Sequence, residues 1–229
     1  MLNKEIIEIV NNFKKTGWMP EPEAKRLFAM AGLDIPGFAW AHTPEKAFRF
    51  ADQTGFPLVA KVVSPRIIHK SDVGGVITGI DSKDKLEMAY HAFSKLDGFD
   101  GMLVEETVTG QELIVGAKID YQFGPVILLG IGGTGVEIYQ DVTMRMTPID
   151  KGDVISMIDS LKGGKILRGF RGGEPVNLDA LTLLLSGFSS LVTDLEEHIQ
   201  SIDLNPVMCS GKRCVIADAR IILNGTNLA

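Results

Sequence analysis

The feature that most constrains the fold is a lysine inside a short apolar run, followed by a polar loop with two adjacent glycines. The run covers residues 58–63 and is typical of a buried strand, except that Lys61 interrupts it. A buried ammonium group is costly unless an anion meets it. A second apolar stretch at 76–80 predicts a partner strand, so the segment forms a strand, a loop and a strand.

The loop between these strands carries residue types that a phosphate site uses. They are His69, Lys70, Ser71, Asp72, Gly74 and Gly75. Small residues and glycines leave backbone N–H groups free to approach a phosphate, and Lys61 adds a compact positive charge. An ordinary hairpin with a solvated loop explains the same pattern. The spacing alone leaves both interpretations open.

Composition excludes some classes of partner. The chain has 229 residues, 45% of them hydrophobic and 23% charged, which suits one large domain or two small lobes. Its formal net charge of −6 argues against a broad nucleic-acid surface, although a local basic pocket is compatible with it. We find no apolar signal region at the N-terminus, and the apolar runs are too short to span a bilayer. We therefore expect a cytoplasmic protein with no membrane or nucleic-acid partner.

The two cysteines flank a predicted hairpin tip. Cys209 and Cys214 enclose the sequence Ser-Gly-Lys-Arg between two apolar segments. The spacing is compatible with a disulfide across a hairpin, but nothing indicates export, so we expect reduced thiols. A zinc site would need further ligands nearby, and the sequence offers none.

The first part of the chain predicts an α/β lobe, which we place at residues 1–101. Thr43 followed by Pro44 is typical of a helix start, with Thr as the N-cap and Pro at the first helical position. The expected helices cover 3–15, 20–31, 44–54 and 84–96, and the expected strands cover 37–41, 58–63 and 76–80.

The remainder, residues 102–229, predicts a second lobe around an antiparallel sheet. The expected strands cover 102–108, 111–119, 126–130, 136–139, 145–148, 199–205 and 214–223. Helices are expected at 151–161 and 178–195. The segment 162–173 between them is rich in glycine and basic residues, and its Arg168 and Arg171 are candidates for contact with phosphate or with a partner.

Oxygen-bearing side chains gather on strands of this second lobe. Glu105 lies on one predicted strand and Glu112 on the next, while Asp203 and Asn205 lie on a strand near the end of the chain and Asp218 on the strand after it. Carboxylate and amide oxygens on adjacent strands suit Mg²⁺, which takes few protein ligands and completes its octahedron with phosphates and water. Glu137 and Arg145 could contact metal and phosphate, but a cross-strand charge pair explains them equally well.

Three motifs in a fixed order identify a family. They are the segments 68–76, 123–125 and 203–206. Together they resemble the β (ATP-grasp) subunit of ADP-forming acyl-CoA synthetases, the acetate–CoA ligase (ADP-forming) type found in archaea. More distantly, they resemble the β subunit of succinyl-CoA synthetase. The resemblance extends from about residue 20 to residue 223.

The resemblance implies an ATP-grasp fold, in which two α/β lobes enclose a nucleotide. It also implies the reaction acyl-CoA + ADP + phosphate ⇌ carboxylic acid + CoA + ATP, with Mg²⁺ as cofactor and ATP or ADP as substrate. A separate CoA-binding α subunit would form the acyl phosphate, in an α₂β₂ assembly. A histidine on α and then a histidine on β would relay the phosphoryl group to the nucleotide.

The resemblance also carries roles onto this sequence. His69 matches the phosphate-accepting histidine of the β subunit, since a neutral imidazole is a competent nucleophile. Residues expected to bind the nucleotide are Lys61, Lys70, Ser71, Gly74, Gly75, Glu105, Val108, Glu112 and Arg145. Asn205 and Asp218 match the magnesium ligands, with Asp203 nearby. Structural explanations stay open for each: a snorkelling lysine, a solvated histidine, a surface carboxylate or an Asn-Pro turn.

Two other functions compete with this one. A free-standing ATP-grasp carboxylate–amine ligase needs no phosphohistidine and usually carries an additional substrate-binding domain, so the length of this chain argues against it. A nucleotide-binding regulatory subunit would have no use for Mg²⁺ ligands in reacting geometry. Activity without a partner would favour the first, and nucleotide binding without a phosphoprotein would favour the second.

Overall fold

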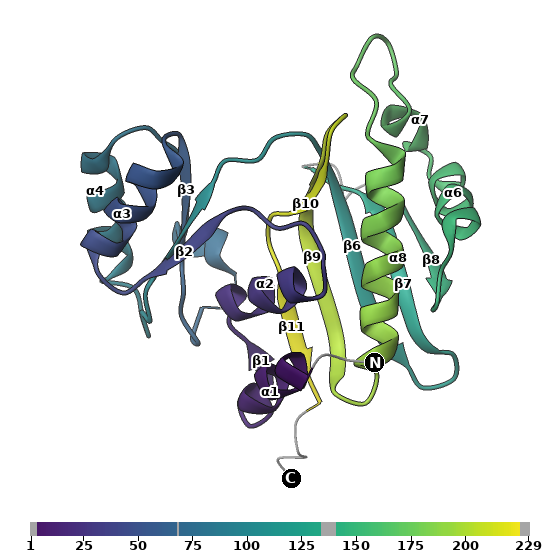
Figure 1. The fold of residues 1–229 in the computed structure, drawn as a ribbon, viewed down its shortest axis with the longest axis horizontal. Coiled ribbons are helices and arrows are strands. Elements are labelled where there is room, and N and C mark those ends of the chain that lie inside the picture. Colours follow the sequence, from purple (N-terminus) through teal and green to yellow (C-terminus); the bar gives the residue numbers. More distant parts are fainter. Residues whose placement is uncertain (1–3, 68, 134–140, 225–229) are drawn as a thin grey trace. The chain divides into compact units, whose positions relative to one another are not determined.

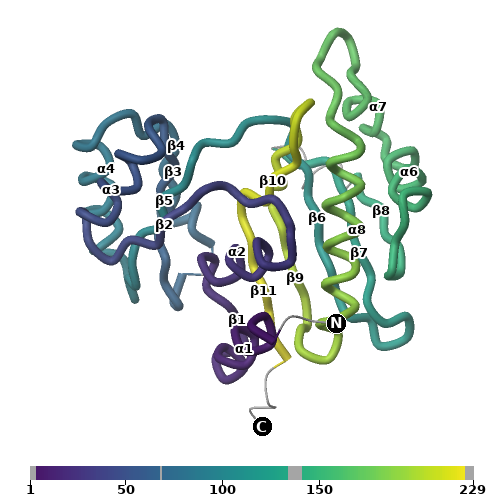
Figure 2. The backbone as a smooth tube through the Cα atoms, in the orientation of Figure 1, coloured from purple at the N-terminus to yellow at the C-terminus, as the bar shows by residue number. Residues whose placement is uncertain are grey.

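The structure, a computed structural model, describes residues 4–67, 69–133 and 141–224. The chain forms two compact units, and each has its own sheet. The larger unit comprises residues 1–35 and 109–229, and the smaller comprises residues 36–108. The chain therefore starts in the larger unit, builds the whole of the smaller one and then returns, as the tube in Figure 2 shows.

The larger unit is built on a sheet of seven described strands, in which every described pair is antiparallel. The strand order is β1-β11-β9-β6-β7-β8, and β10 also pairs with β9. The strands are β1 (Trp18–Met19), β6 (Gln111–Asp120), β7 (Gly124–Ile131), β8 (Val142–Met146), β9 (Ile199–Cys209), β10 (Cys214–Ile216) and β11 (Arg220–Leu223).

Helices cover one face of this sheet (Figure 1). They are α1 (Lys4–Phe13), α2 (Glu21–Met30), α6 (Lys151–Ser160), the short α7 (Gly164–Leu167) and α8 (Leu178–Asp194). The longest of these, α8, begins where the Asn177 side chain accepts a hydrogen bond from the N–H of Ala180. Leu181, Leu185 and Phe188 of α8 are fully buried against the sheet, so the core of this unit lies between α8 and the strands.

The smaller unit has a four-stranded antiparallel sheet in the order β2-β5-β3-β4. Its elements are β2 (Phe38–Ala41), α3 (Pro44–Thr54), β3 (Leu58–Val62), the 3₁₀ helix η1 (Lys70–Val73), β4 (Val76–Ile80), α4 (Lys83–Phe93) and β5 (Met102–Glu106). Apolar residues of α3 and α4 pack against alternate residues of β3 and β5. The opposite face of β3 and β5 therefore carries Lys61 and Glu105.

The boundaries of the two units differ from the expected single boundary after residue 101. Strand β5 pairs with β2 and β3, and so belongs to the smaller sheet, not to the antiparallel block that follows it. The first 35 residues join the larger unit, because β1 pairs with β11 at the far end of the chain. These pairings join residues far apart in the sequence, which local hydrophobic patterns do not encode.

The last strands also differ from their predicted lengths. Strand β9 continues to Cys209, past the predicted end at 205, and the predicted strand 214–223 is two strands, β10 and β11, that both pair with β9. The predicted strand 145–148 is β8, which starts earlier and pairs with β7. Its expected partner at 136–139 lies outside the described residues.

Cys209 and Cys214 lie directly opposite each other in the β9–β10 register, and both are buried free cysteines. The interaction with the Cys214 thiol, together with burial, raises the pKa of Cys209 far above its usual value. Both observations agree with the expectation of reduced thiols. In the part of the chain that the structure describes, no helix has the length and apolar character needed to cross a membrane.

Candidate functional site

In the smaller unit, the buried lysine of β3 has a carboxylate partner. Lys61 Nζ lies 3.0 Å from Glu105 Oε2 on the adjacent strand β5, and both side chains are buried. Burying two charges is costly, and a close pairing offsets part of that cost. The sequence indicated that Lys61 needs an anion. It did not identify Glu105 as that anion, because strand register decides which carboxylate lies on the same face.

The loop that follows β3 presents the predicted histidine to solvent. His69 precedes η1 as its N-cap residue and is exposed, and among the described residues the structure gives its ring no hydrogen-bond partner. The backbone N–H of Asp72 donates to the His69 carbonyl at 3.3 Å. Lys70 and Ser71 begin η1, and Ser71 is exposed.

The two glycines fix the shape of this loop. Gly74 adopts a left-handed conformation, with φ of 65°, which favours glycine. A Cβ atom on Gly75 would lie 2.6 Å from Val62 Cγ1 and 2.9 Å from the Lys70 carbonyl oxygen. The N–H groups of Gly74 and Gly75 donate to Ser71 and Lys70. They are therefore not free for a phosphate in this conformation, which differs from the expectation.

In the larger unit, two of the three predicted metal ligands lie in the middle of β9, and the third lies on the loop between β10 and β11. Asp203 and Asn205 alternate with the buried residues Ile202 and Leu204, so they lie on the face of the sheet opposite the helices. Asp218 follows β10, and its N–H donates to the Pro206 carbonyl at 3.3 Å. The Asp218 backbone thus lies next to β9 at Pro206, and the magnesium site itself stays a prediction.

The carboxyl of Asp203 lies close enough to a second carboxylate to be affected by its charge. The pKa of Asp203 is raised because protein atoms crowd its carboxyl and because the Asp218 carboxylate is close, while Arg220 acts in the opposite direction. Asp203 nevertheless remains exposed at the surface, so solvent screens the repulsion. In the described ranges no group of three or more His, Cys, Asp or Glu side chains could hold a metal ion. Two carboxylates and an amide fit Mg²⁺, which takes few protein ligands.

Glu112 lies on the same face of the sheet as Asp203. It is opposite Met208 in the β6–β9 register, while Gly116, four residues along β6, is opposite Asp203. The Glu112 carbonyl accepts a 2.8 Å hydrogen bond from the N–H of Gly132, which ties β6 to the start of the glycine-rich turn after β7. A carboxylate beside such a turn has acceptor oxygens available for hydroxyl groups.

Arg145 lies on the other face of the sheet from Glu112 and Asp203. It is opposite Ile127 of the core in the β7–β8 register, so it lies on the helical face of the sheet. Its guanidinium donates to the Met144 carbonyl at 2.8 Å and to Ser156 Oγ of α6 at 2.9 Å. The alternative partner Glu137 lies outside the described residues.

The remaining predicted residues have separate positions. Val108 is the last residue of the smaller unit, two residues after β5. Arg168 forms an ion pair with Asp159 of α6, with Nη2 and Oδ1 2.5 Å apart. Arg171 stacks over the ring of Phe170 at 5.3 Å. The predicted set is thus divided between the units, with Lys61 to Val108 in the smaller one and Glu112 to Asp218 in the larger one.

Two α/β units with antiparallel sheets and this division of residues define a class. The family model of the ATP-grasp domain matches residues 12–223, and the predicted ATP-grasp fold is thereby confirmed. Within that class, the chain belongs to the family of β subunits of ADP-forming acetate–CoA ligases. It is 38% identical over 211 residues to the acetate–CoA ligase (ADP-forming) I subunit β of Pyrococcus furiosus, covering 89% of this chain and 90% of the relative.

Two further similarities bear on how such a subunit works. The chain is 36% identical over 228 residues to the 4-hydroxybutyrate–CoA ligase (ADP-forming) of Nitrosopumilus maritimus; the match covers 95% of this chain but 32% of that protein. Its fold matches acetyl-coenzyme A synthetase 1 of Candidatus Korarchaeum cryptofilum, solved with coenzyme A and Mg-AMPPCP. The TM-score is 0.85 and the identity 36%, covering 95% of this chain and 99% of that one.

Proposed function

We propose that this β subunit carries a phosphoryl group on His69 between a partner subunit and ADP. The observation that carries this proposal is the exposed imidazole at the start of η1, which has no partner among the described residues. The Korarchaeum relative supports it, since that structure is described with its phosphohistidine segment pointing towards the nucleotide binding site. The overall reaction is acyl-CoA + ADP + phosphate ⇌ carboxylic acid + CoA + ATP.

The proposed relay passes one phosphoryl group from carrier to carrier. On the partner subunit, phosphate displaces CoA from acyl-CoA and gives an acyl phosphate. A partner histidine takes the phosphoryl group, which releases the carboxylate, and passes it to an imidazole nitrogen of His69. An oxygen of the terminal phosphate of ADP then attacks the phosphorus. The P–N bond breaks, ATP forms and His69 returns as the neutral imidazole.

The residues proposed to hold the nucleotide occur along the chain between Lys61 and Glu112. Lys61, Lys70 and Ser71 would bind its phosphates, and the backbone from Glu105 to Val108 would bind the adenine. Glu112 would accept the ribose hydroxyls. Arg145 has no part in this proposal, because it lies on the helical face of the sheet, opposite the face that carries Glu112.

Asn205, Asp218 and Asp203 would hold Mg²⁺. The crowded carboxylates of Asp203 and Asp218 support this assignment, because a divalent cation would relieve their repulsion. Mg²⁺ supplies neutralisation of the phosphate charge during transfer. The Korarchaeum relative was solved with a magnesium nucleotide analogue, which agrees with a metal-dependent nucleotide site in this family.

Phosphorylation of His69 tests the proposal directly. The purified chain is incubated with γ-labelled ATP and Mg²⁺, and protein-bound label is tested for lability in acid and stability in base. We expect label on the wild type and on His91→Ala, which removes another exposed histidine, and none on His69→Ala. Label that persists on His69→Ala, or a failure to label even with the CoA-binding subunit present, would overturn the relay.

A further inference from the structure

A lysine of α2 is fully buried although it carries a charge. Lys25 has 0% of its surface exposed. Its Nζ donates to the Ala217 carbonyl at 2.7 Å and lies 3.2 Å from Glu21 Oε1, one helical turn earlier. Burying an ammonium group costs several kcal/mol before its partners are counted. A neutral side chain of similar length would fill the same core volume, so packing alone does not explain the charge.

The carbonyl that Lys25 binds belongs to the residue before Asp218. Residues 217–219 join β10 to β11, and the N–H groups of Ala217 and Asp218 both donate to the Pro206 carbonyl, at 3.0 and 3.3 Å. Pro206 in turn follows Asn205 in β9. The peptide that carries Asp218 is therefore bound on one side by β9 and on the other by Lys25.

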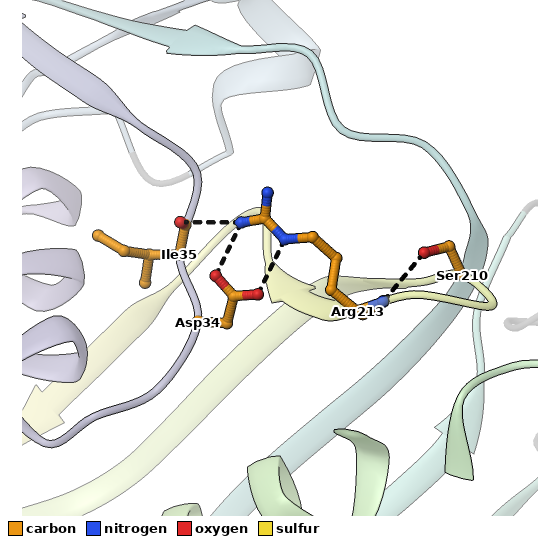
Figure 3. Close-up of polar contacts among 4 residues, drawn as sticks. All are labelled: Asp34, Ile35, Ser210 and Arg213. Atoms are coloured by element: carbon orange, nitrogen blue, oxygen red, sulfur yellow. Dashed lines mark hydrogen bonds and ion pairs between the residues drawn. The ribbon is translucent and has the colours of Figure 1, made fainter. Parts of the chain in front are cut away.

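The end of α2 is also fixed to this part of the sheet. Asp34, four residues after α2, accepts hydrogen bonds from Arg213 Nε at 2.9 Å and Arg213 Nη2 at 2.7 Å, as Figure 3 shows. The Asp34 carbonyl accepts a hydrogen bond from the N–H of Ile216 at 2.9 Å. With α2 held at this end, Lys25 contacts the Asp218 peptide from a rigid helix.

We propose that Lys25 is a positioning residue for the cation site. Its ammonium group holds the Ala217 carbonyl and thereby orients the Asp218 carboxylate beside Asn205. This inference rests on the proposed Mg²⁺ site. Groups that orient metal ligands without touching the metal typically change metal affinity by about 10- to 100-fold when they are replaced. Without the ammonium, the Ala217 carbonyl loses its 2.7 Å hydrogen bond to α2, and the loop gains freedom.

Binding of ADP to the purified chain, measured by isothermal titration calorimetry at increasing Mg²⁺ concentrations, tests this role. We expect Lys25→Met to weaken the apparent affinity for Mg²⁺ by roughly 10-fold or more, while ADP affinity in EDTA stays within about twofold, because the nucleotide contacts are unchanged. Lys25→Gln serves as a second variant if the methionine variant does not fold. Asp218→Asn is the direct-ligand control.

A structural control separates positioning from loss of stability. Met157→Ala removes core volume from α6 in the same unit, so it lowers the melting temperature at a distance in sequence from α2 and the Asp218 loop. If Met157→Ala weakens Mg²⁺ binding as much as Lys25→Met does, the effect is general and the inference is wrong. If Asp218→Asn loses Mg²⁺ dependence while the Lys25 variants keep it, the inference alone fails. If wild-type binding does not depend on Mg²⁺, the proposed metal site fails and the inference with it.

Discussion

At the residue scale, the charged side chains differ in whether their strongest charge interaction is attractive or repulsive. The two buried lysines have carboxylates within ion-pair distance: Lys61 is 3.0 Å from Glu105, and Lys25 is 3.2 Å from Glu21. Asp203 differs from them, because the repulsion from the Asp218 carboxylate outweighs the attraction of Arg220. An added cation close to Asp203 and Asp218 would relieve this repulsion.

The repulsion at Asp203 predicts a pH-dependent effect of removing its charge. Because the folded-state pKa of Asp203 lies above the ordinary value of 3.8, the ionised carboxylate lowers stability, fully so above the raised pKa. The cost disappears as the pH falls through that pKa towards 3.8 and below. Asp203→Asn should therefore stabilise the metal-free protein at pH 7 by about 0.5 kcal/mol or less, since solvent screens an exposed group.

Urea denaturation of wild type and Asp203→Asn in EDTA, from pH 4 to pH 8, measures this difference. The stability gap should narrow as the pH falls, because the Asp203 carboxyl takes up its proton more readily in the folded state than in the unfolded state. Asp194→Asn, at the end of α8, controls for the loss of a carboxylate elsewhere in the same unit. A gap that widens on acidification would mean that the Asp203 carboxylate is stabilised, contrary to the proposed cation site.

At the scale of elements, backbone hydrogen bonds and a left-handed glycine define the conformation of the loop from β3 to β4. Gly75 docks the loop on β3, because its carbonyl accepts a 2.8 Å hydrogen bond from the N–H of Val62. Gly74 supplies the left-handed residue that ends η1. The glycines therefore determine where η1, and with it His69, emerges from the sheet.

Gly75→Ala should destabilise the protein and disturb the loop together. The added Cβ would meet Val62 Cγ1 at 2.6 Å, so β3 or the loop must shift, and overpacking of this kind costs about 1–3 kcal/mol. We expect a lower midpoint of urea denaturation and reduced His69 labelling. Gly37→Ala is the matched control in the same unit, since its Cβ would be 3.9 Å from the nearest atom, the Glu106 carboxylate. Equal effects from both substitutions would contradict this role of Gly75.

Helices and strands that have local sequence patterns could be predicted, but the pairing between strands could not. Helix α6 was expected at 151–161 and is found at Lys151–Ser160, where Asp150 and Asp153 form a capping box. Strand β5 was predicted nearly correctly as a strand, but it was placed in the wrong sheet, because its pairing with β2 and β3 is set by tertiary contacts. The buried pair of Glu21 and Lys25 left only a weak signal, an i, i+4 spacing that is also common on exposed helix faces.

The positions of the predicted site residues likewise depend on strand register, which the sequence does not show. Asp203 and Asn205 share a face of β9, because alternation along a strand fixes which side chains do so, while their role as magnesium ligands stays a prediction. Arg145 does not join them, because the face on which a residue of β8 lies depends on register with β7. The identity of Glu105 as the partner of Lys61 depends on register in the same way.

At the scale of the whole molecule, the chain is one module of a larger enzyme. The Pyrococcus relative that matches it over 90% of its length is itself a subunit β. In the Nitrosopumilus ligase the matching region is 32% of a single longer chain, so the other two thirds are covalently attached there. The CoA-binding nature of the partner subunit and the α₂β₂ assembly stay predictions for this chain.

Dependence on the partner gives the last prediction. With acetyl-CoA, ADP, phosphate and Mg²⁺, the purified chain alone should form no ATP, because none of its proposed roles includes making the acyl phosphate. Adding the CoA-binding subunit should start ATP formation, measured by coupled luminescence, and His69→Ala should abolish it while His91→Ala leaves it unchanged. Size-exclusion chromatography of the mixture reports assembly independently of activity. ATP consumption by the chain alone, with a carboxylic acid and an amine, would instead favour a free-standing carboxylate–amine ligase.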